Sequence, residues 1–159
     1  MEALIIIDVQ NGLVNKNLFN KIIFLENINK AIIENTKKNN LIIFVQHNST
    51  TLKTGTKDWE IYSGLIQNNN IIIQKKHGDA FQNTKLNNIL LEKNIKEIII
   101  CGLVSNGCVF YTCKSGIENG FNVSVIKNGH TNWLKDAENK IIEINNKLEN
   151  IGVKVIENQ

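Results

Sequence analysis

Short runs of apolar, mostly β-branched residues recur along this chain of 159 residues, and segments of helical length separate most of them. Several of these runs are apolar throughout instead of alternating apolar with polar residues. Continuous apolar runs are typical of strands that are covered on both faces, as in a parallel sheet. We expect strands at residues 3–7, 41–46, 71–73, 97–101 and 122–126, with a weaker sixth at 152–156.

The segments between these runs place apolar residues at the three- and four-residue spacing of an amphipathic helix. In segment 21–38, this spacing predicts one buried face made of Ile22, Leu25, Ile28, Ile32 and Ile33. The same pattern predicts helices at residues 21–38, 84–93, 108–119 and 133–150. The stretch 48–70 has no clear period, and loops of that length in compact domains are usually functional.

Regular alternation of strand and helix implies right-handed crossovers and a sheet covered by helices on both faces. We therefore expect an α/β fold: a three-layer α/β/α, doubly wound arrangement around a mostly parallel six-stranded sheet. The length suits one domain, so we expect a single domain over residues 1–159. Ligands bind such sheets at the carboxyl ends of the strands, which directs attention to the residues that follow each run.

Composition argues against several classes of function. The net charge is only +3, and the lysines form no basic stripe of the kind that nucleic acid or a membrane surface requires. No apolar stretch reaches the roughly 18 residues that span a bilayer. The three cysteines form no disulfide framework, and the chain opens without a leader-like segment. We expect a cytoplasmic protein with reduced thiols and no nucleic-acid or membrane partner.

The loop after the fourth run, Gly102-Leu103-Val104-Ser105-Asn106-Gly107-Cys108-Val109, places Cys108 at the start of a predicted helix. The amides and dipole of a helix start favour an anion, and thiolate is the reactive form of cysteine, so this position predicts a reactive thiol of low pKa. The alternative is a buried, inert thiol, which fits Cys101 and Cys113 better. The loop is not a phosphate-binding loop, because Cys108 and Val109 stand where that loop needs Lys and a hydroxyl residue.

Two charged residues follow other predicted strands. Asp8 ends the first run, where a buried carboxylate is costly unless it is paired or used; a structural, loop-capping role is the alternative. Lys75 follows the third run, although Lys76 fits the spacing equally well and lysine is more often a solvated surface charge. Together, an acid, an ammonium group and a thiol at one sheet edge would make an activated nucleophile with a proton acceptor and a cation beside it.

On these residues the sequence resembles the isochorismatase-like cysteine hydrolases, a family that includes nicotinamidases and other small amidohydrolases. The resemblance covers nearly the whole chain and rests on three motifs at predicted strand ends. They are Asp8-Val9-Gln10-Asn11, Lys75-Lys76-His77-Gly78-Asp79-Ala80-Phe81 with Thr84-x-Leu86, and the loop leading to Cys108 with Thr112 one turn on.

The resemblance implies a catalytic triad of Asp8, Lys75 and Cys108. The lysine of this family lies six residues before the Phe of an Ala-Phe pair, which selects Lys75 over Lys76. In such enzymes the aspartate accepts the thiol proton and the lysine stabilises the thiolate. The sulfur attacks an amide carbonyl, and water hydrolyses the resulting thioester.

The family pattern implies two further features of the site. Its oxyanion hole would consist of the backbone amides of Val104 and Cys108, after a cis peptide bond between Leu103 and Val104. Nicotinamidases also hold a metal with an Asp-x-His pair and a further His, but Gln46-His47 stands here without that pair. A stable metal site needs three or more ligands, so we expect no metal and no other cofactor, and nicotinamide becomes a less favoured substrate.

We expect Gln10, His47, Trp59 and Phe81 beside the substrate, with His47 as a hydrogen-bonding residue and the aromatic rings as an apolar wall. The alternative for the aromatic residues, strongest for Phe81, is a place in the core or in a subunit interface. Members of the family are commonly dimers or larger, so the resemblance implies a homodimer or a higher homo-oligomer.

The resemblance, together with these residues, implies a cysteine-dependent hydrolase that cleaves a C–N bond in a small amide, lactam or carbamoyl compound through a thioester. The alternative is a non-catalytic protein of the same fold, used as a binding or scaffold protein, which the presence of all three triad residues disfavours. Another alternative is a hydrolase that cleaves a vinyl ether. Such an enzyme needs no thiol nucleophile, so the presence of Cys108 disfavours it. A thiol–disulfide oxidoreductase needs a Cys-x-x-Cys pair, which the sequence lacks.

Overall fold

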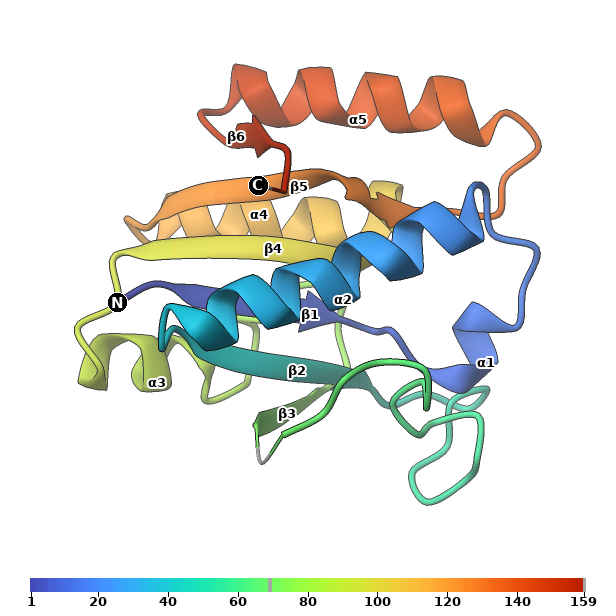
Figure 1. Cartoon of the computed structure of the whole chain (residues 1–159), viewed down its shortest axis with the longest axis horizontal. Coiled ribbons are helices and arrows are strands. Elements are labelled where there is room, and N and C mark those ends of the chain that lie inside the picture. Colours follow the sequence, from blue (N-terminus) through green and yellow to red (C-terminus); the bar gives the residue numbers. More distant parts are fainter. Residues whose placement is uncertain (69, 159) are drawn as a thin grey trace.

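Six strands form one parallel sheet in the computed structural model, which describes residues 1–68 and 70–158 (Figure 1). The strands are β1 (Ala3–Ile7), β2 (Leu41–His47), β3 (Ile71–Lys75), β4 (Glu97–Leu103), β5 (Asn122–Thr131) and β6 (Lys154–Ile156). Their order across the sheet is β3-β2-β1-β4-β5-β6. The expected doubly wound sheet is confirmed, and every pair of neighbouring strands in it is parallel.

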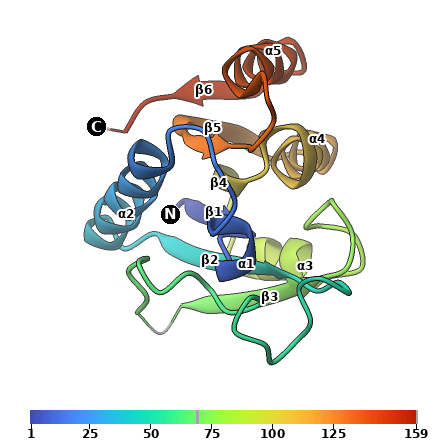
Figure 2. The ribbon, with the colours of Figure 1, turned by 90° about the vertical axis from the view of Figure 1, so that its right-hand side faces the viewer.

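Helices cover both faces of this sheet. They are α1 (Asn11–Val14), α2 (Lys21–Lys37), α3 (Leu86–Glu92), α4 (Phe110–Glu118) and α5 (Ala137–Asn150), with a π-helical turn, η1 (Ser105–Val109), directly before α4. Figure 2 shows α2 on one side of the sheet and α3, α4 and α5 on the other. Right-handed crossovers explain this division, because α2 leads across the sheet in one direction and the other three lead in the opposite direction.

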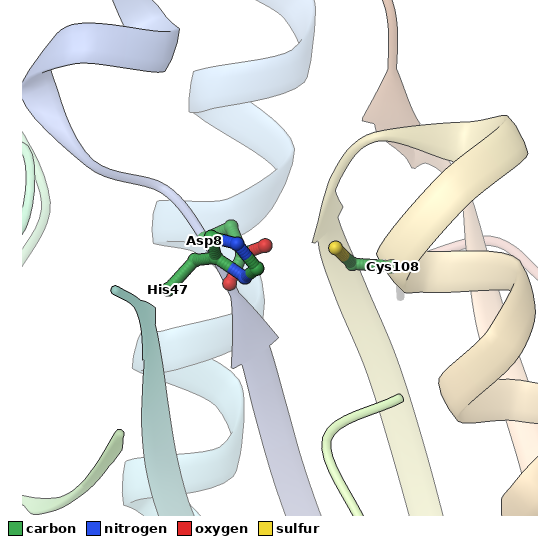
Figure 3. A group of neighbouring side chains, drawn as sticks. All are labelled: Asp8, His47 and Cys108. Atoms are coloured by element: carbon green, nitrogen blue, oxygen red, sulfur yellow. The ribbon is translucent and has the colours of Figure 1, made fainter. Parts of the chain in front are cut away.

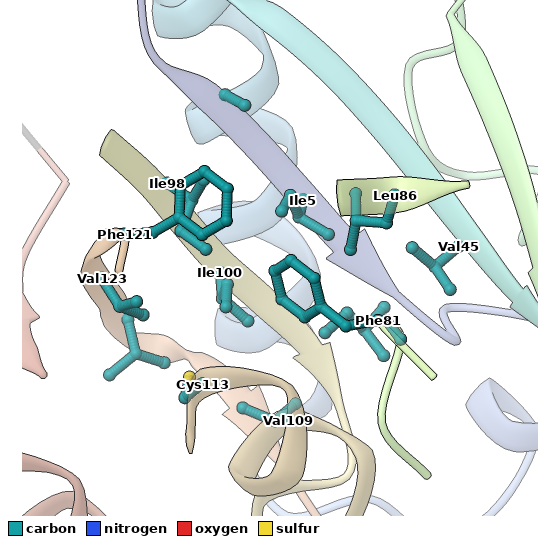
Figure 4. Close-up of a cluster of buried hydrophobic side chains, with 14 of the residues drawn as sticks. Ile5, Val45, Phe81, Leu86, Ile98, Ile100, Val109, Cys113, Phe121 and Val123 are labelled. Carbon is teal, nitrogen blue, oxygen red and sulfur yellow. The ribbon is translucent and has the colours of Figure 1, made fainter. Parts of the chain in front are cut away.

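Two clusters of buried apolar side chains join the sheet to its helices. Leu4 and Ile6 of β1 face α2, where Phe24 is among their neighbours. Ile5 faces the opposite side, in a cluster that includes Leu86 of α3 (Figure 4). All residues of β1 are therefore buried, which is why this central strand is apolar throughout its length.

Several elements differ from the sequence expectation. β5 continues past Ile126 to Thr131, because its last residues pair with β4 again after a shift of register between Ile100 and Gly102. The helix expected over 108–119 begins only at Phe110, and Cys108 lies in η1. The helices expected over 84–93 and 133–150 begin later, at α3 and α5, and α1 was not expected.

β1, β2, β3 and β4 are adjacent in the sheet, and because the sheet is parallel their carboxyl ends lie along the same edge. β1 and β4 are neighbours at the middle of the sheet. From β1 the chain continues to β2, on one flank of this pair, and from β4 it continues to β5, on the opposite flank. Such a switch point leaves a crevice at the carboxyl ends of the two strands. Asp8 follows β1 and Cys108 lies in the turn after β4, while β2 and β3 end at His47 and Lys75.

Candidate active site

Asp8 is the first residue after β1, and its side chain is held at the switch point. Its backbone φ is 57°, in the left-handed region that aspartate and asparagine tolerate better than most residues. Its N–H still donates to the carbonyl of Val45, at 2.9 Å, so the chain turns while it stays bound to β2. Oδ2 contacts Lys75, whereas Oδ1 is buried and has no hydrogen-bond partner among the described residues.

The ammonium group of Lys75 lies among three acceptors. Its Nζ is 3.0 Å from Asp8 Oδ2, 2.7 Å from His47 Nδ1 and 3.2 Å from Cys108 Sγ. Lys75 is 2% exposed, and Lys76 next to it is exposed. Because an ammonium group has three hydrogens, these contacts occupy all of its donors.

Cys108 reaches this cluster from η1, and Figure 3 shows its sulfur facing Asp8. The sulfur and the nearest ligand atoms of Asp8 and His47 lie within 4.8 Å of one another. The turn is irregular: Gly107 has φ −131° and ψ −114°, outside the helical and extended regions. The expected cis peptide bond between Leu103 and Val104 is present.

A glycine allows β4 to pass close to β1 just before this turn. Gly102 has a φ of +127°, and a Cβ at this position would lie 2.1 Å from the carbonyl oxygen of Ile7. No side chain fits there, and L residues rarely adopt that φ. Gly102 therefore lets β4 pair with β1 as far as Ile7, shortly before η1 begins at Ser105.

The surroundings of the three titratable groups decide their protonation. Burial, helped by the Asp8 carboxylate, raises the pKa of the Cys108 thiol to about 12, although Lys75 acts in the opposite direction. The expectation of a low pKa is thus wrong, because the sulfur is shielded from water and has an acid as well as a cation beside it. Burial also raises the pKa of Asp8, against the effect of Lys75. Burial and Lys75 lower the pKa of His47, so its imidazole is neutral at pH 7 and accepts a hydrogen bond from the ammonium group.

The family model described as the isochorismatase domain matches residues 2–156. The chain belongs to the isochorismatase family. It is therefore a hydrolase, and its sheet with helices on both faces is the three-layer α/β/α fold of that family.

Relatives of this isochorismatase-family hydrolase include the uncharacterized protein YddQ of Bacillus subtilis, 32% identical over 71 residues. That match covers 45% of this chain and 39% of YddQ, well under half of the relative's length. A crystal structure described as an isochorismatase family protein is 25% identical, with a TM-score of 0.91 over 98% of both chains. The pyrazinamidase of Pyrococcus horikoshii in complex with zinc has a TM-score of 0.85 over 98% of both chains; at 19% identity it shows the fold alone.

The donors at this site do not fit a metal ion. In the described part of the chain, Asp8, His47 and Cys108 form the one group of three possible metal ligands. All three contact the ammonium group of Lys75, so a cation of the protein's own already lies between them.

Two residues expected beside the substrate have other contacts. Gln10 is fully buried; its Nε2 donates to the carbonyls of His47 and Trp59 at 3.0 and 2.8 Å, and its Oε1 accepts from the His47 N–H at 2.9 Å. Its amide therefore binds the end of β2 to the long loop, with both N–H donors used and the side chain shielded from solvent. Phe81 stacks on Phe121 in the core, with ring centroids 5.8 Å apart, because its side chain points inward (Figure 4).

The loop 48–70 lies over the same edge of the sheet. Ile61 makes an antiparallel bridge with Gln10, and the Asn11 N–H donates to the carbonyl of Glu60 at 2.9 Å. Trp59 is half-buried, and its Nε1 donates to Asn48 Oδ1 at 2.6 Å. Trp59 stays a prediction for substrate contact, since these bonds hold it beside the end of β2.

The contact between His47 and Lys75 was not anticipated, although the sequence carried a signal for it. The two residues end neighbouring strands and are directly paired in register. Side chains at paired positions lie on the same face of a sheet. His47 therefore meets the Lys75 ammonium through Nδ1, and its expected contact with substrate stays a prediction.

Proposed function

We propose that this hydrolase cleaves the C–N bond of a small amide, lactam or carbamoyl compound, with Cys108 as nucleophile and a thioester as intermediate. One observation carries the proposal. Asp8 and Cys108 both contact the Lys75 ammonium, although the three residues follow or end three different strands. The free Oδ1 of Asp8 supports it further, because a buried acceptor without a partner is ready to receive a proton.

In the first half-reaction, the Cys108 sulfur bonds to the substrate's carbonyl carbon while its proton passes to Asp8. The two events are coupled because the thiol is protonated at rest. The raised pKa of Asp8 suits a temporary proton carrier. The backbone amides of Val104 and Cys108 stabilise the oxyanion. Asp8 then protonates the leaving nitrogen, the C–N bond breaks, and ammonia or an amine departs.

In the second half-reaction, water hydrolyses the thioester. Asp8 takes a proton from the water, whose oxygen bonds to the carbonyl carbon. The C–S bond breaks, the sulfur regains a proton from Asp8, and a carboxylic or carbamic acid leaves. Lys75 acts throughout as a fixed positive charge, because its three hydrogens are already bonded within the protein.

His47 contributes by holding Lys75 in place. Neutral His47 accepts from the ammonium through Nδ1, so its remaining proton is on Nε2. That Nε2–H has no hydrogen-bond partner in the described part of the chain and stays free to bind an acceptor on the substrate.

A screen of primary amides, lactams and carbamoyl compounds tests the proposal, with release of ammonia or amine as readout and Cys108→Ala as the blank. We expect at least one compound to be hydrolysed by the wild type only, with an acyl adduct on Cys108 in the mass spectrum of quenched enzyme. Equal hydrolysis by Cys108→Ala would contradict a cysteine mechanism. If no compound is hydrolysed and no adduct forms, the non-catalytic alternative is favoured.

We also propose one hydrolase domain over residues 1–159, a homodimer or larger homo-oligomer, and a cytoplasmic location without nucleic-acid partners. A single sheet that includes all six described strands supports the first point. No helix in the described residues is both long and apolar enough to cross a membrane. Light scattering after gel filtration tests the oligomer, which a mass near 18.0 kDa would contradict; cell fractionation tests the location.

A further inference from the structure

His130 is a buried titratable residue that the proposed mechanism does not use. It lies in β5, paired with Gly102 of β4, and is 2% exposed. Its Nδ1 is 2.8 Å from Ser105 Oγ, and its Nε2 is 2.8 Å from Asn145 Oδ1. These two contacts connect β5 with the first residue of η1 on one side and with α5 on the other.

The hydrogen bonds in this chain of side chains have a defined direction. Asn145 Oδ1 can only accept, so Nε2 of His130 carries the ring proton and Nδ1 accepts from the Ser105 hydroxyl. Burial lowers the pKa of His130 to about 4, which keeps the ring neutral at pH 7. Ser105 and His130 are both buried, so neither is placed to contact a substrate.

The turn that receives this contact has little regular backbone bonding of its own. The Val104 carbonyl accepts from both Gly107 and Val109, at 3.1 and 3.2 Å, and Gly107 departs from helical geometry. Among the described residues, Ser105 Oγ and Cys108 Sγ are the side-chain atoms of η1 that make hydrogen bonds. Packing of α5 against η1 brings Asn145 within reach of the same chain.

We propose that Ser105, His130 and Asn145 are positioning residues that hold η1, and with it the Cys108 sulfur and the amides of the oxyanion hole, in the reactive geometry. In this way α5 acts on the active site without contacting the substrate. The effect on hydrolysis rests on the proposed function. The effect on the Cys108 thiol does not depend on any substrate.

Four single variants test the proposal. Asn145→Ala removes the acceptor on α5, Ser105→Ala removes the hydroxyl donor, and Ser105→Thr keeps a hydroxyl. Asn35→Ala is the control, because Asn35 is likewise a helix amide whose side chain is hydrogen-bonded, but it lies in α2, outside the proposed chain. Its Nδ2 donates to the Ala31 carbonyl at 2.9 Å, and its Oδ1 accepts from Asn40 at 2.8 Å. For each protein we would measure kcat, KM, the thermal midpoint and the rate at which iodoacetamide alkylates Cys108, followed by peptide mass spectrometry.

We expect Ser105→Ala and Asn145→Ala each to lower kcat about tenfold, with KM changed less than about threefold. Ser105→Thr should recover most of the kcat. The double variant should be no worse than the poorer single one, because both changes break the same chain. Asn35→Ala should lower the thermal midpoint and leave kcat unchanged. Wild-type kcat in folded Asn145→Ala, or losses that add in the double variant, would overturn the proposal.

Alkylation separates this proposal from the proposed function. If the wild type hydrolyses nothing beyond the Cys108→Ala blank, the proposed function fails. The alkylation rates still decide whether Ser105, His130 and Asn145 hold η1 in place. We expect Ser105→Ala and Asn145→Ala to be alkylated at Cys108 at least about threefold faster than the wild type, because a loosened turn exposes the sulfur to water and lowers its pKa. Unchanged rates in both variants would overturn the inference.

Discussion

The hydrogens of one ammonium group limit what its neighbours can do. Lys75 donates to Asp8, His47 and Cys108 at once, so His47 must present a lone pair on Nδ1. A protonated imidazole has none and would repel the lysine. Burial and Lys75 lower the pKa of His47, so the required neutral form is present at neutral pH and is lost as the pH falls through that lowered pKa.

His47→Asn tests this requirement. The amide oxygen of Asn can take the place of Nδ1, so we expect kcat within about tenfold of the wild type, whereas His47→Phe, which has no acceptor, should lose about 10²-fold or more. The groups around His47 are Lys75, Asp8, Cys108 and His77. The acid limb of kcat/KM, measured from about pH 4 to about pH 8, should move to lower pH in His47→Asn because an amide does not titrate. An acid limb that stays in place would show that His47 protonation is not limiting.

Asp8→Asn should change labelling and catalysis in opposite directions. Asp8 raises the pKa of the Cys108 thiol and Lys75 lowers it, so removal of the carboxylate charge increases the thiolate fraction. We expect alkylation of Cys108 at pH 7 to become about tenfold faster, and hydrolysis to become at least about 10²-fold slower because the proton acceptor is gone. Cys101 and Cys113 are fully buried, and their unchanged labelling is the internal control. Slower labelling of Cys108 would show that Asp8 ionises the thiol at rest.

Which residues meet at the site could be predicted from the motifs, but not what each side chain contacts. Choosing Lys75 over Lys76 agrees with the structure, where Lys75 is buried beside Asp8 and Lys76 is exposed. Gln10 and Phe81 belong to the same motifs, yet one bonds only to backbone and the other stacks in the core. A motif indicates nearness to the site, whereas the direction of a side chain depends on packing by elements far away in the sequence.

At the scale of the elements, the close approach of β4 to β1 predicts a large difference between two glycines. A Cβ at Gly102 would meet the Ile7 carbonyl oxygen, whereas one at Gly120 would meet nothing within 4 Å; both have positive φ. We expect Gly102→Ala to lower the free energy of unfolding by more than about 3 kcal/mol and Gly120→Ala to lower it by about 1 kcal/mol. Urea unfolding measures both. Equal losses would mean that the left-handed backbone, and not the contact with Ile7, sets the requirement.

The two elements that carry the site's irregular geometry were the ones the sequence described least well. The apolar run of β5 ends before Lys127, Asn128 and Gly129. The strand nevertheless continues through these residues, because its last residues pair with β4 again after the register shift. Cys108 follows a glycine, as the start of a helix can, but Gly107 leaves helical geometry and places Cys108 in η1. Hydrophobic periodicity reports regular burial, so it cannot show a bulge or a π-helical turn.

At the scale of the whole molecule, alternation of strand and helix was enough to predict a parallel sheet but not the order of its strands. Other doubly wound orders are compatible with the same alternation. The observed order, β3-β2-β1-β4-β5-β6, makes β1 and β4 neighbours and so brings Asp8 beside the turn that carries Cys108. The triad is thus a consequence of topology, since its members lie on segments that are far apart along the chain.

Burial of His130 makes the stability of the whole molecule depend on pH. In the unfolded chain a histidine has a pKa near 6.5, whereas burial lowers the pKa of folded His130 to about 4. Between these values the unfolded state binds more protons, so stability is fully present above about pH 6.5 and is lost as the pH falls toward 4. The wild type should therefore lose roughly 2–3 kcal/mol more than His130→Gln between about pH 7.5 and about pH 4.5.

Urea unfolding of both proteins at the two pH values measures this difference. Asp8, whose raised pKa acts in the opposite direction, is present in both proteins, so its contribution cancels in the comparison. A titration of the His130 ring by NMR in the wild type gives an independent check, because the ring should stay neutral down to about pH 5. Equal pH dependence in the two proteins, or protonation of His130 near pH 6, would mean that the buried ring is no more costly to charge than an exposed one.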